Sequence, residues 1–446
     1  YGYTFEWSHP ASGHLSLGKL LRCAEIDYIS GPSSYSTRQP GQTAAFPWPI
    51  DSFLLNGKLA VFEEDFRTPI GKSDDDDRLP LMKTPQALEA AHWRGAGAAL
   101  AHGGGLNWMD MRGQGWLNSR GIWERGSKVL AALNWRVSSP MKDPDVALMI
   151  DERSLAYLAD PRAFEELVQD VREALLRSGM SVGFYLLSDL AHRENFPDAR
   201  LFIFVNAWDI RPEVRSSIKA RLQKEEKVLF WLYSAGLFEG GRESLERARE
   251  ATGIALRPQP FNSKPGTNLV NLRDPLCRTL PNDMMAEGGT LEPSYFAIPE
   301  DATVLGEYIQ TGLPSFVVRK FPSPNTNDEP WTSVFLGEPV VTPGLFKALG
   351  QMAGCHIYSL DDDVIHVSAP FLSLHCAGAG VRTINLPDKW TCYDLIQRVW
   401  MPVENNTLKF LGLDGSTYSL LIGHKADIEQ LINTPPETVV TEEEIL

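Results

Sequence analysis

Residues 58–68 read Lys58-Leu-Ala-Val-Phe-Glu-Glu-Asp-Phe-Arg-Thr68, an apolar run that ends in three acids and an arginine. Short apolar and aromatic runs bounded by polar residues are typical of β-strands, so we predict a strand from Lys58 to Glu64. An acidic run, Asp74–Asp77, follows, and a helix is predicted from Pro85 to Gly95. The stretch is therefore one strand–helix unit with acids at the carboxyl end of its strand.

Similar units surround this stretch within residues 1 to 140. Strands are predicted at Tyr3–Trp7, Ile26–Ser30 and Gly97–Asp110, with a helix near Leu15–Cys23. Alternating strands and helices indicate an α/β fold, and in a βα barrel the catalytic groups lie at the carboxyl ends of the strands. All four predicted strands end in reactive or aromatic residues: Glu6 and Trp7; Tyr35 and Arg38; Glu63, Glu64, Asp65 and Arg67; and Trp108, Asp110 and Trp116.

Carbohydrate chemistry fits this collection of side chains. A carboxylate can attack or stabilise an anomeric carbon, and flat indole rings stack on the apolar face of a sugar ring. Core packing alone does not explain why acids and aromatic residues recur at each strand end. We therefore expect a carbohydrate as the substrate or ligand.

The remaining chain changes character twice. Strands at Val146–Ile150, Ser181–Leu187, Leu201–Val205 and Lys227–Tyr233 alternate with helices at Arg162–Ser178 and Pro212–Lys224, which is the spacing of a doubly wound parallel sheet. Beyond residue 355, short strands split by turns such as Asp414-Gly415 suggest a small antiparallel β domain. The tail Glu437–Leu446 is expected to fray.

Composition excludes several classes of partner. The 446 residues carry 42 Lys and Arg against 57 Asp and Glu, a net charge of −15 that disfavours nucleic acids and anionic membranes. No apolar run is long enough for a membrane span. The 5 scattered cysteines include no Cys-x-x-Cys pair and favour the cytoplasm, although the compartment stays open. We expect neither a cofactor nor a metal.

Four stretches together resemble glycoside hydrolase family 42: Gly13-His-Leu-Ser-Leu17, Asp27-Tyr-Ile-Ser-Gly-Pro-Ser-Ser-Tyr-Ser36, Asp51–Thr68, and Trp108-Met-Asp-Met111 with Gly115-Trp116. The resemblance implies a retaining β-galactosidase-type enzyme acting on β-galactosides or related β-linked sugars. It also implies a barrel followed by a Rossmann-like, amidotransferase-like trimerisation domain and a small β-sandwich domain. The corresponding domain ranges are 1–143, 144–355 and 356–446.

The resemblance assigns roles to individual residues. The family nucleophile is a Glu at the end of barrel strand seven, and it corresponds to Glu63 here. Glu64 is the next residue of the strand, so its side chain faces the opposite side. Arg67 is expected to orient Glu63 and keep it ionised. The predicted substrate-binding residues are Trp7, Tyr35, Arg38, Glu64, Arg67, Trp108, Asp110 and Trp116.

The sequence departs from the family at the general acid. The family acid/base Glu follows an Asn at the end of strand four, and no Asn-Glu pair occurs here. Tyr3–Trp7 matches strand five, so the chain supplies the C-terminal half of a (β/α)8 barrel, strands five to eight. Three interpretations are open. The chain is a fragment of a longer enzyme, or it associates with a separate chain that supplies the first half, or it closes its own barrel by self-association. In the last case the homo-oligomer is a trimer or a multiple of a trimer.

In the last case Glu6 is the candidate acid/base, about 5 to 5.5 Å from Glu63. The alternative function is a non-catalytic sugar-binding or assembly protein with a degenerate half barrel.

Other reactive residues carry weaker patterns. The run Asp74–Asp77 lacks the Gly-punctuated spacing of a calcium loop, and the spacings of Cys355-His356, His366 and His375-Cys376 match no zinc motif. In the amidotransferase-like domain, the turn Tyr233-Ser-Ala-Gly236 lacks the nucleophilic Cys of class I glutamine amidotransferases. That domain is predicted to be a scaffold for oligomers.

Overall fold

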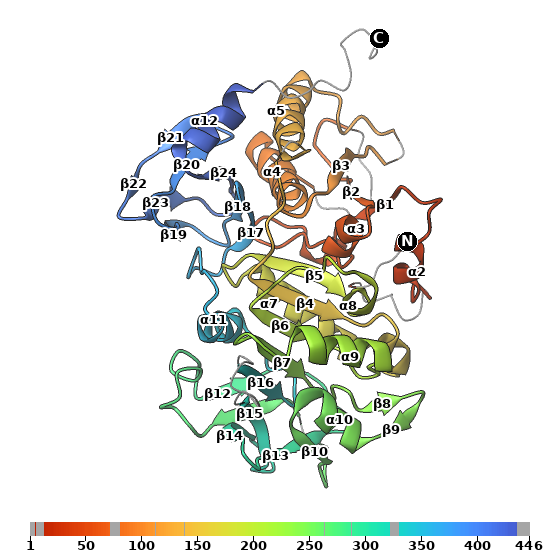
Figure 1. Ribbon diagram of the computed structural model, residues 1–446. Coiled ribbons are helices and arrows are strands. Elements are labelled where there is room, and N and C mark those ends of the chain that lie inside the picture. The colour runs from red at the N-terminus through yellow and green to blue at the C-terminus, as the bar shows by residue number, and fades with distance from the viewer. Residues whose placement is uncertain are drawn as a thin grey trace. The chain divides into compact units, whose positions relative to one another are not determined.

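The computed structural model describes Phe5 and residues 13–71, 81–111, 113–137, 139–262, 264–286, 288–321 and 330–434. The fold is mixed α/β, with parallel sheets and antiparallel sheets toward the C-terminus (Figure 1). Contacts group the chain into two compact units. Unit 1 comprises residues 1–27, 46–58 and 143–357, and unit 2 comprises residues 28–45, 59–142 and 358–446.

Unit 2 contains a three-stranded parallel sheet of β1 (Tyr28–Pro32), β2 (Leu59–Glu64) and β3 (Gly105–Trp108), in that spatial order. The register places Pro32 and Asn107 beside Glu63. Burial alternates along β1 and β2, because successive side chains point to opposite faces of a sheet. One face is therefore buried, and the other, the uncovered face, is partly exposed in the described part of the chain.

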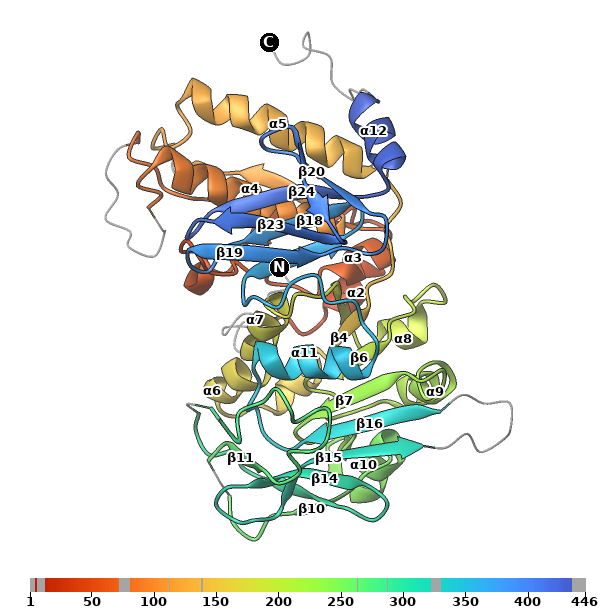
Figure 2. The ribbon, with the colours of Figure 1, turned by 90° about the vertical axis from the view of Figure 1, so that its left-hand side faces the viewer.

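Helix α4 (Pro85–His102) covers the buried face of this sheet. It begins where the Thr84 hydroxyl accepts the N–H of Ala87 at 3.1 Å, and it ends at Gly103, whose φ of +66° suits glycine. Its other side packs on β18 (Phe371–His375), as Figure 2 shows. A helix held between two sheets is buried all round, which explains its Ala- and Gly-rich sequence.

Antiparallel strands complete unit 2. A five-stranded sheet has the order β17-β18-β24-β20-β21, and a three-stranded sheet has the order β19-β23-β22. Their bounds are β17 (Val364–Ser368), β24 (Thr417–Gly423), β20 (Thr391–Asp394), β21 (Val399–Met401), β19 (Gly380–Asn385), β23 (Thr407–Gly412) and β22 (Val403–Glu404). Helices α5 (Arg120–Val137) and α12 (Lys425–Asn433) pack beside α4 and β24 respectively. The predicted antiparallel sheets near the C-terminus are confirmed.

Unit 1 is built on a nine-stranded sheet in the order β12-β11-β14-β15-β16-β7-β6-β4-β5. The five strands from β16 to β5 run parallel, and the others antiparallel. Strands β4, β5, β6 and β7 are buried along their whole length, because helices lie on both faces of such sheets. The bounds are β4 (Val146–Ile150), β5 (Val182–Leu186), β6 (Leu201–Phe204), β7 (Val228–Leu232), β16 (Trp331–Leu336), β15 (Pro314–Phe321), β14 (Thr303–Tyr308), β11 (Gly266–Leu269) and β12 (Asp283–Met285).

The short helices α2 (Leu17–Leu21) and α3 (Asp51–Leu55) also belong to unit 1. Asp51 accepts the N–H of Phe184 and Ser52 accepts the N–H of Leu186, both at 2.7 Å. These bonds satisfy backbone N–H groups on the outer side of the edge strand β5, which has no neighbouring strand on that side. The other helices of unit 1 are α6 (Pro161–Phe164), α7 (Asp170–Leu176), α8 (Asp189–His192), α9 (Pro212–Arg221), α10 (Leu245–Thr252) and α11 (Pro343–Met352).

One sequence prediction of secondary structure is wrong. Residues 97–102, predicted as the start of a strand, continue α4, and the strand begins at Gly105. At Gly97 an added Cβ would overlap the side chain of Ser373, so the glycine permits close approach of β18. In the described ranges, no helix combines the length and the apolar composition that crossing a membrane requires.

Candidate active site

Strand β2 presents two neighbouring glutamates to opposite faces of the parallel sheet. Glu63 lies on the uncovered face, is half-buried, and accepts a hydrogen bond from the Ser30 hydroxyl at 2.6 Å. Ser30 belongs to β1, next to β2 in the sheet, and its side chain is on the same face. One carboxylate oxygen of Glu63 is therefore held by the adjacent strand.

Glu64 lies on the covered face, between β2 and α4, and is only 3 % exposed. Its carboxyl group fills the space left by Gly95, where an added Cβ would overlap Oε1. Burial raises the pKa of Glu64 to about 8, although the charge of Arg94 and the indole of Trp108 partly offset this. The group is thus mostly protonated at neutral pH. Glu64 is therefore enclosed in this structure, and its predicted contact with a substrate stays a prediction.

An ion pair stands at the end of β2, two residues beyond Glu63. The buried Arg38 guanidinium donates to Asp65 Oδ1 and, through Nε at 3.0 Å, to the carbonyl of Ser33. The Tyr35 hydroxyl donates to the second Asp65 oxygen at 2.8 Å, and the Arg38 guanidinium lies 4.0 Å from the centre of the Tyr35 ring. The predicted residues Tyr35 and Arg38 therefore come together around Asp65, while the Tyr35 ring stays partly exposed.

Helix α4 fixes the loop that carries this ion pair. Arg94 donates to the backbone carbonyls of Gln39 and Gln42 at 2.9 and 2.8 Å, and to that of Arg38 at 2.7 Å. Sequence reasoning missed both Arg94 and Ser30. An arginine within a helix and a serine within a strand carry no local pattern that marks them as site residues.

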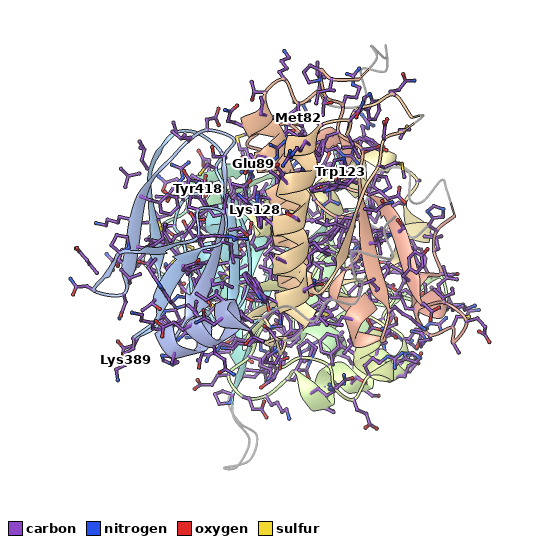
Figure 3. All side chains as sticks on the ribbon, turned by 90° about the horizontal axis from the view of Figure 1, so that it is seen from above. Met82, Glu89, Trp123, Lys128, Lys389 and Tyr418 are labelled. Carbon is purple, nitrogen blue, oxygen red and sulfur yellow. The ribbon has the colours of Figure 1, made fainter. Side chains whose placement is uncertain are left out.

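The three residues predicted after β3 build the covered side and the following loop. Trp108 stacks on His92 of α4, with ring centres 4.0 Å apart, and its ring centre is 6.3 Å from that of Trp123. Trp123, labelled in Figure 3, belongs to α5. Asp110 accepts the backbone N–H groups of residues 114, 115 and 116, between 2.6 and 3.1 Å. Trp116 is 1 % exposed. Trp108 thus packs on His92, Trp116 is buried and Asp110 holds the loop, while their predicted contacts with a substrate stay predictions.

The remaining predicted site residues are placed as follows. Arg67 is half-buried, and its backbone forms an isolated bridge with Leu81. Glu6 and Trp7 lie outside the described residues. Within the described ranges, no group of three or more His, Cys, Asp and Glu side chains could hold a metal ion.

The face that carries Glu63 is partly exposed in the described part of the chain. It consists of Tyr28, Ser30, Pro32, Leu59, Val61, Glu63, Gly105 and Asn107, and we call this set the open face. Tyr28 is 61 % exposed and Leu59 is 43 % exposed, although both lie within strands. Parallel sheets are normally covered on both faces. Glu63 itself is half-buried, so it is partly accessible on a face that is normally inside a fold.

No protein-family model and no curated protein matches the chain. Solved structures do. A catalytic mutant of Gan42B, a family 42 β-galactosidase from G. stearothermophilus, matches with a TM-score of 0.58 over 91% of this chain at 12% identity. A β-galactosidase from the haloarchaeon Halorubrum lacusprofundi matches with a TM-score of 0.55 over 90% of this chain at 10% identity. A β-galactosidase from Marinomonas ef1 matches with a TM-score of 0.50 over 86% at 13% identity.

The fold of this chain is thus similar to part of the family 42 β-galactosidases, as the resemblance in the sequence predicts. The chain spans 61%, 58% and 57% of the three solved chains, about three-fifths of their length. Identities this low show a shared fold, and they do not show a shared activity.

Proposed function

We propose that this chain carries the nucleophile of a retaining β-glycosidase and that Glu63 is that nucleophile. The observation that supports this most is the opposite placement of the two glutamates. Glu63 lies on the open face with a hydrogen bond from Ser30, whereas Glu64 is buried against α4. In this proposal β1, β2 and β3 are strands six to eight of a barrel, and Glu63 stands at the carboxyl end of the seventh.

The proposed reaction has two steps. The Glu63 carboxylate attacks the anomeric carbon of a β-galactoside or related sugar, and the bond to the leaving oxygen breaks as that oxygen gains a proton. Water then attacks the glycosyl ester, releases Glu63 as a carboxylate, and yields the β-sugar. The neighbouring Asp65 carboxylate is paired with Arg38, so its charge is compensated within the folded chain.

The first step needs a general acid. Of the residues that define the open face, Glu63 alone carries a carboxyl group. The acid must therefore come from elsewhere, either from Glu6 or from protein that covers the open face. We propose that such a cover closes the barrel. It is a further part of the same polypeptide, a separate chain or another copy of this chain. We also propose that the Rossmann-like domain forms a trimer.

The second candidate is a sugar-binding or assembly protein without catalysis. The lone carboxyl group on the open face favours it, because glycoside hydrolysis ordinarily uses two.

A mechanism-based label separates the two candidates. A 2-fluoro-galactoside with a dinitrophenyl leaving group needs little acid assistance, so it tests the nucleophile without the missing acid. We expect the intact mass of the chain to rise by one fluorosugar, with Glu63→Gln unlabelled and Glu64→Gln labelled. An unlabelled wild-type chain would support the non-catalytic alternative, and a labelled Glu63→Gln variant would reject the assignment of Glu63.

A further inference from the structure

Unit 1 contains a cavity of about 470 Å³ that the proposed glycosidase reaction does not use. It lies beyond the carboxyl ends of β4, β6 and β7, and its lining includes Tyr157, Trp208 and Tyr233 from the segments that follow these strands. Ligands of open α/β sheets bind outside the carboxyl ends of the parallel strands. The volume is within the range of small-molecule sites, which is roughly 300 to 1,000 Å³. Its place and its size are thus those of a ligand site.

The backbone is strained where β7 ends at the cavity. Tyr233 has a φ of +65°, in the left-handed region that non-glycine residues seldom adopt. Two other segments of the same chain hold this conformation. The Tyr233 N–H donates to the carbonyl of Leu336 at 2.8 Å, and the Tyr233 hydroxyl donates to the carbonyl of Pro293. Strained residues of this kind cluster at binding and catalytic sites.

Five aromatic side chains line the cavity: Tyr157, Trp208, Tyr233, Phe238 and Tyr295. Tyr157 and Phe238 stack with ring centres 5.0 Å apart and an interplanar angle of 11°. Trp208 and Tyr295 each meet the ring of Tyr233, at 6.0 and 6.3 Å between centres. Flat rings at several angles suit a ligand that has C–H faces of its own.

Two buried polar groups of the wall have no hydrogen-bond partner among the described residues. One Glu166 oxygen accepts the N–H of Gly289 at 3.0 Å, and the other has no hydrogen-bond partner among the described residues. The indole N–H of Trp208, also a buried group, has none there either. Buried polar groups are rarely left unpaired, so each calls for a bonding partner that the free chain does not supply.

The charge of the lining decides between classes of ligand. Asp160, Glu166 and Glu292 are acidic, and Arg162, the one basic residue among the described residues of the lining, is paired with Asp160 at 2.8 Å. The excess of acids repels phosphates and carboxylates. A cation would suit the rings and acids, yet it could not accept a hydrogen bond from Trp208. A hydroxyl group both donates and accepts, so it can satisfy Glu166 and Trp208.

We propose that this cavity is a second carbohydrate site, which binds a neutral mono- or disaccharide without hydrolysing it. The C–H faces of the sugar stack on the aromatic wall, and its hydroxyl groups donate to Glu166 and accept from Trp208. The inference is independent of Glu63, so either assignment can fail alone.

The test measures binding to the full-length chain carrying Glu63→Gln, by calorimetry and saturation-transfer NMR. Galactose, glucose and lactose are the sugar probes, with choline and inorganic phosphate as the cationic and anionic ones. We expect a sugar to bind, and Glu166→Gln and Trp208→Phe each to weaken it about tenfold, the cost of one lost hydrogen bond to a charged or buried group. The matched variants are Glu165→Gln, an exposed neighbour, and Trp123→Phe in unit 2, and both should bind as before.

Three results would overturn the proposal: no sugar bound, choline or phosphate bound in place of sugar, or sugar affinity unchanged in a pocket variant that is folded. A thermal melt of each variant keeps a folding defect from imitating lost affinity. Because Glu166→Gln and Trp208→Phe alter different walls of the cavity, either folded variant suffices for the decision.

Discussion

The buried carboxyl group of Glu64 makes the stability of unit 2 depend on pH. Its pKa is raised from 4.5 to about 8 by burial, so the folded chain holds a proton that the unfolded chain has lost across that interval. The sign follows from linkage: the free energy of unfolding falls as pH rises from about 4.5 to about 8. Each pH unit within it costs about 1.4 kcal/mol.

Glu64→Gln removes this dependence, because a glutamine has nearly the same shape and no charge to lose. Between pH 5 and pH 7 the variant should therefore gain about 3 kcal/mol relative to wild type. Hydrogen exchange of the α4 amides, which report unfolding of unit 2, measures the difference at each pH. Other buried acids titrate in both proteins and cancel.

The exposed Glu124 of α5 supplies the control, since Glu124→Gln alters a glutamate outside the core. The reasoning is refuted if the stability difference between Glu64→Gln and wild type is the same at pH 5 and pH 7. That result would mean that Glu64 ionises in the folded chain as easily as in water.

Three further variants probe the same region. Ser30→Ala removes the hydroxyl that donates to Glu63. We expect the fluorosugar to label Glu63 about tenfold more slowly, and the free energy of unfolding to change by no more than about 1 kcal/mol. An unchanged labelling rate would contradict this. Gly95→Ala forces a methyl group into the Glu64 carboxyl and should lower the free energy of unfolding by about 1 to 3 kcal/mol, as measured in thermal melts. The control is Gly121→Ala on α5, where the atom nearest to the added methyl group is 3.8 Å away, and it should not destabilise the chain. Equal melting temperatures of the two variants would count against the packing described. Asp65→Asn leaves the Arg38 charge buried without its partner and should cost about 3 to 5 kcal/mol by urea unfolding, so a loss below about 1 kcal/mol would show that the ion pair is not buried.

The two faces of β2 were predictable from sequence because a strand has a period of two. Once Glu63 is placed on one side, Glu64 must be on the other, and the structure has this arrangement. The same rule explains Trp108. It pairs with Glu64 across β2 and β3 and so shares the covered face, but this register comes from the sheet and is not written in the sequence near Trp108.

The extent of α4 was only partly predictable from its own residues. Alanine is the strongest helix former, so the alanines between Ala96 and Ala101 favour a helix, and the strand prediction gave more weight to the glycines than to them. The close approach of β18 at Gly97 comes from residues far along the chain and has no local signal. The role of Arg94 depends on the same distant packing, since its bonds are to backbone carbonyls of a loop. Local pattern thus predicts the site on β2, and tertiary contacts determine its surroundings.

The central claim is that the Glu63 carboxylate attacks the anomeric carbon from the open face. Azide rescue tests it most directly: Glu63→Gly is incubated with a dinitrophenyl β-galactoside and azide, and proton NMR identifies the product. Azide in the space of the lost carboxylate should give the α-galactosyl azide, while Glu64→Gly should give none. A β-configured azide, or rescue in Glu64→Gly in place of Glu63→Gly, would contradict the claim.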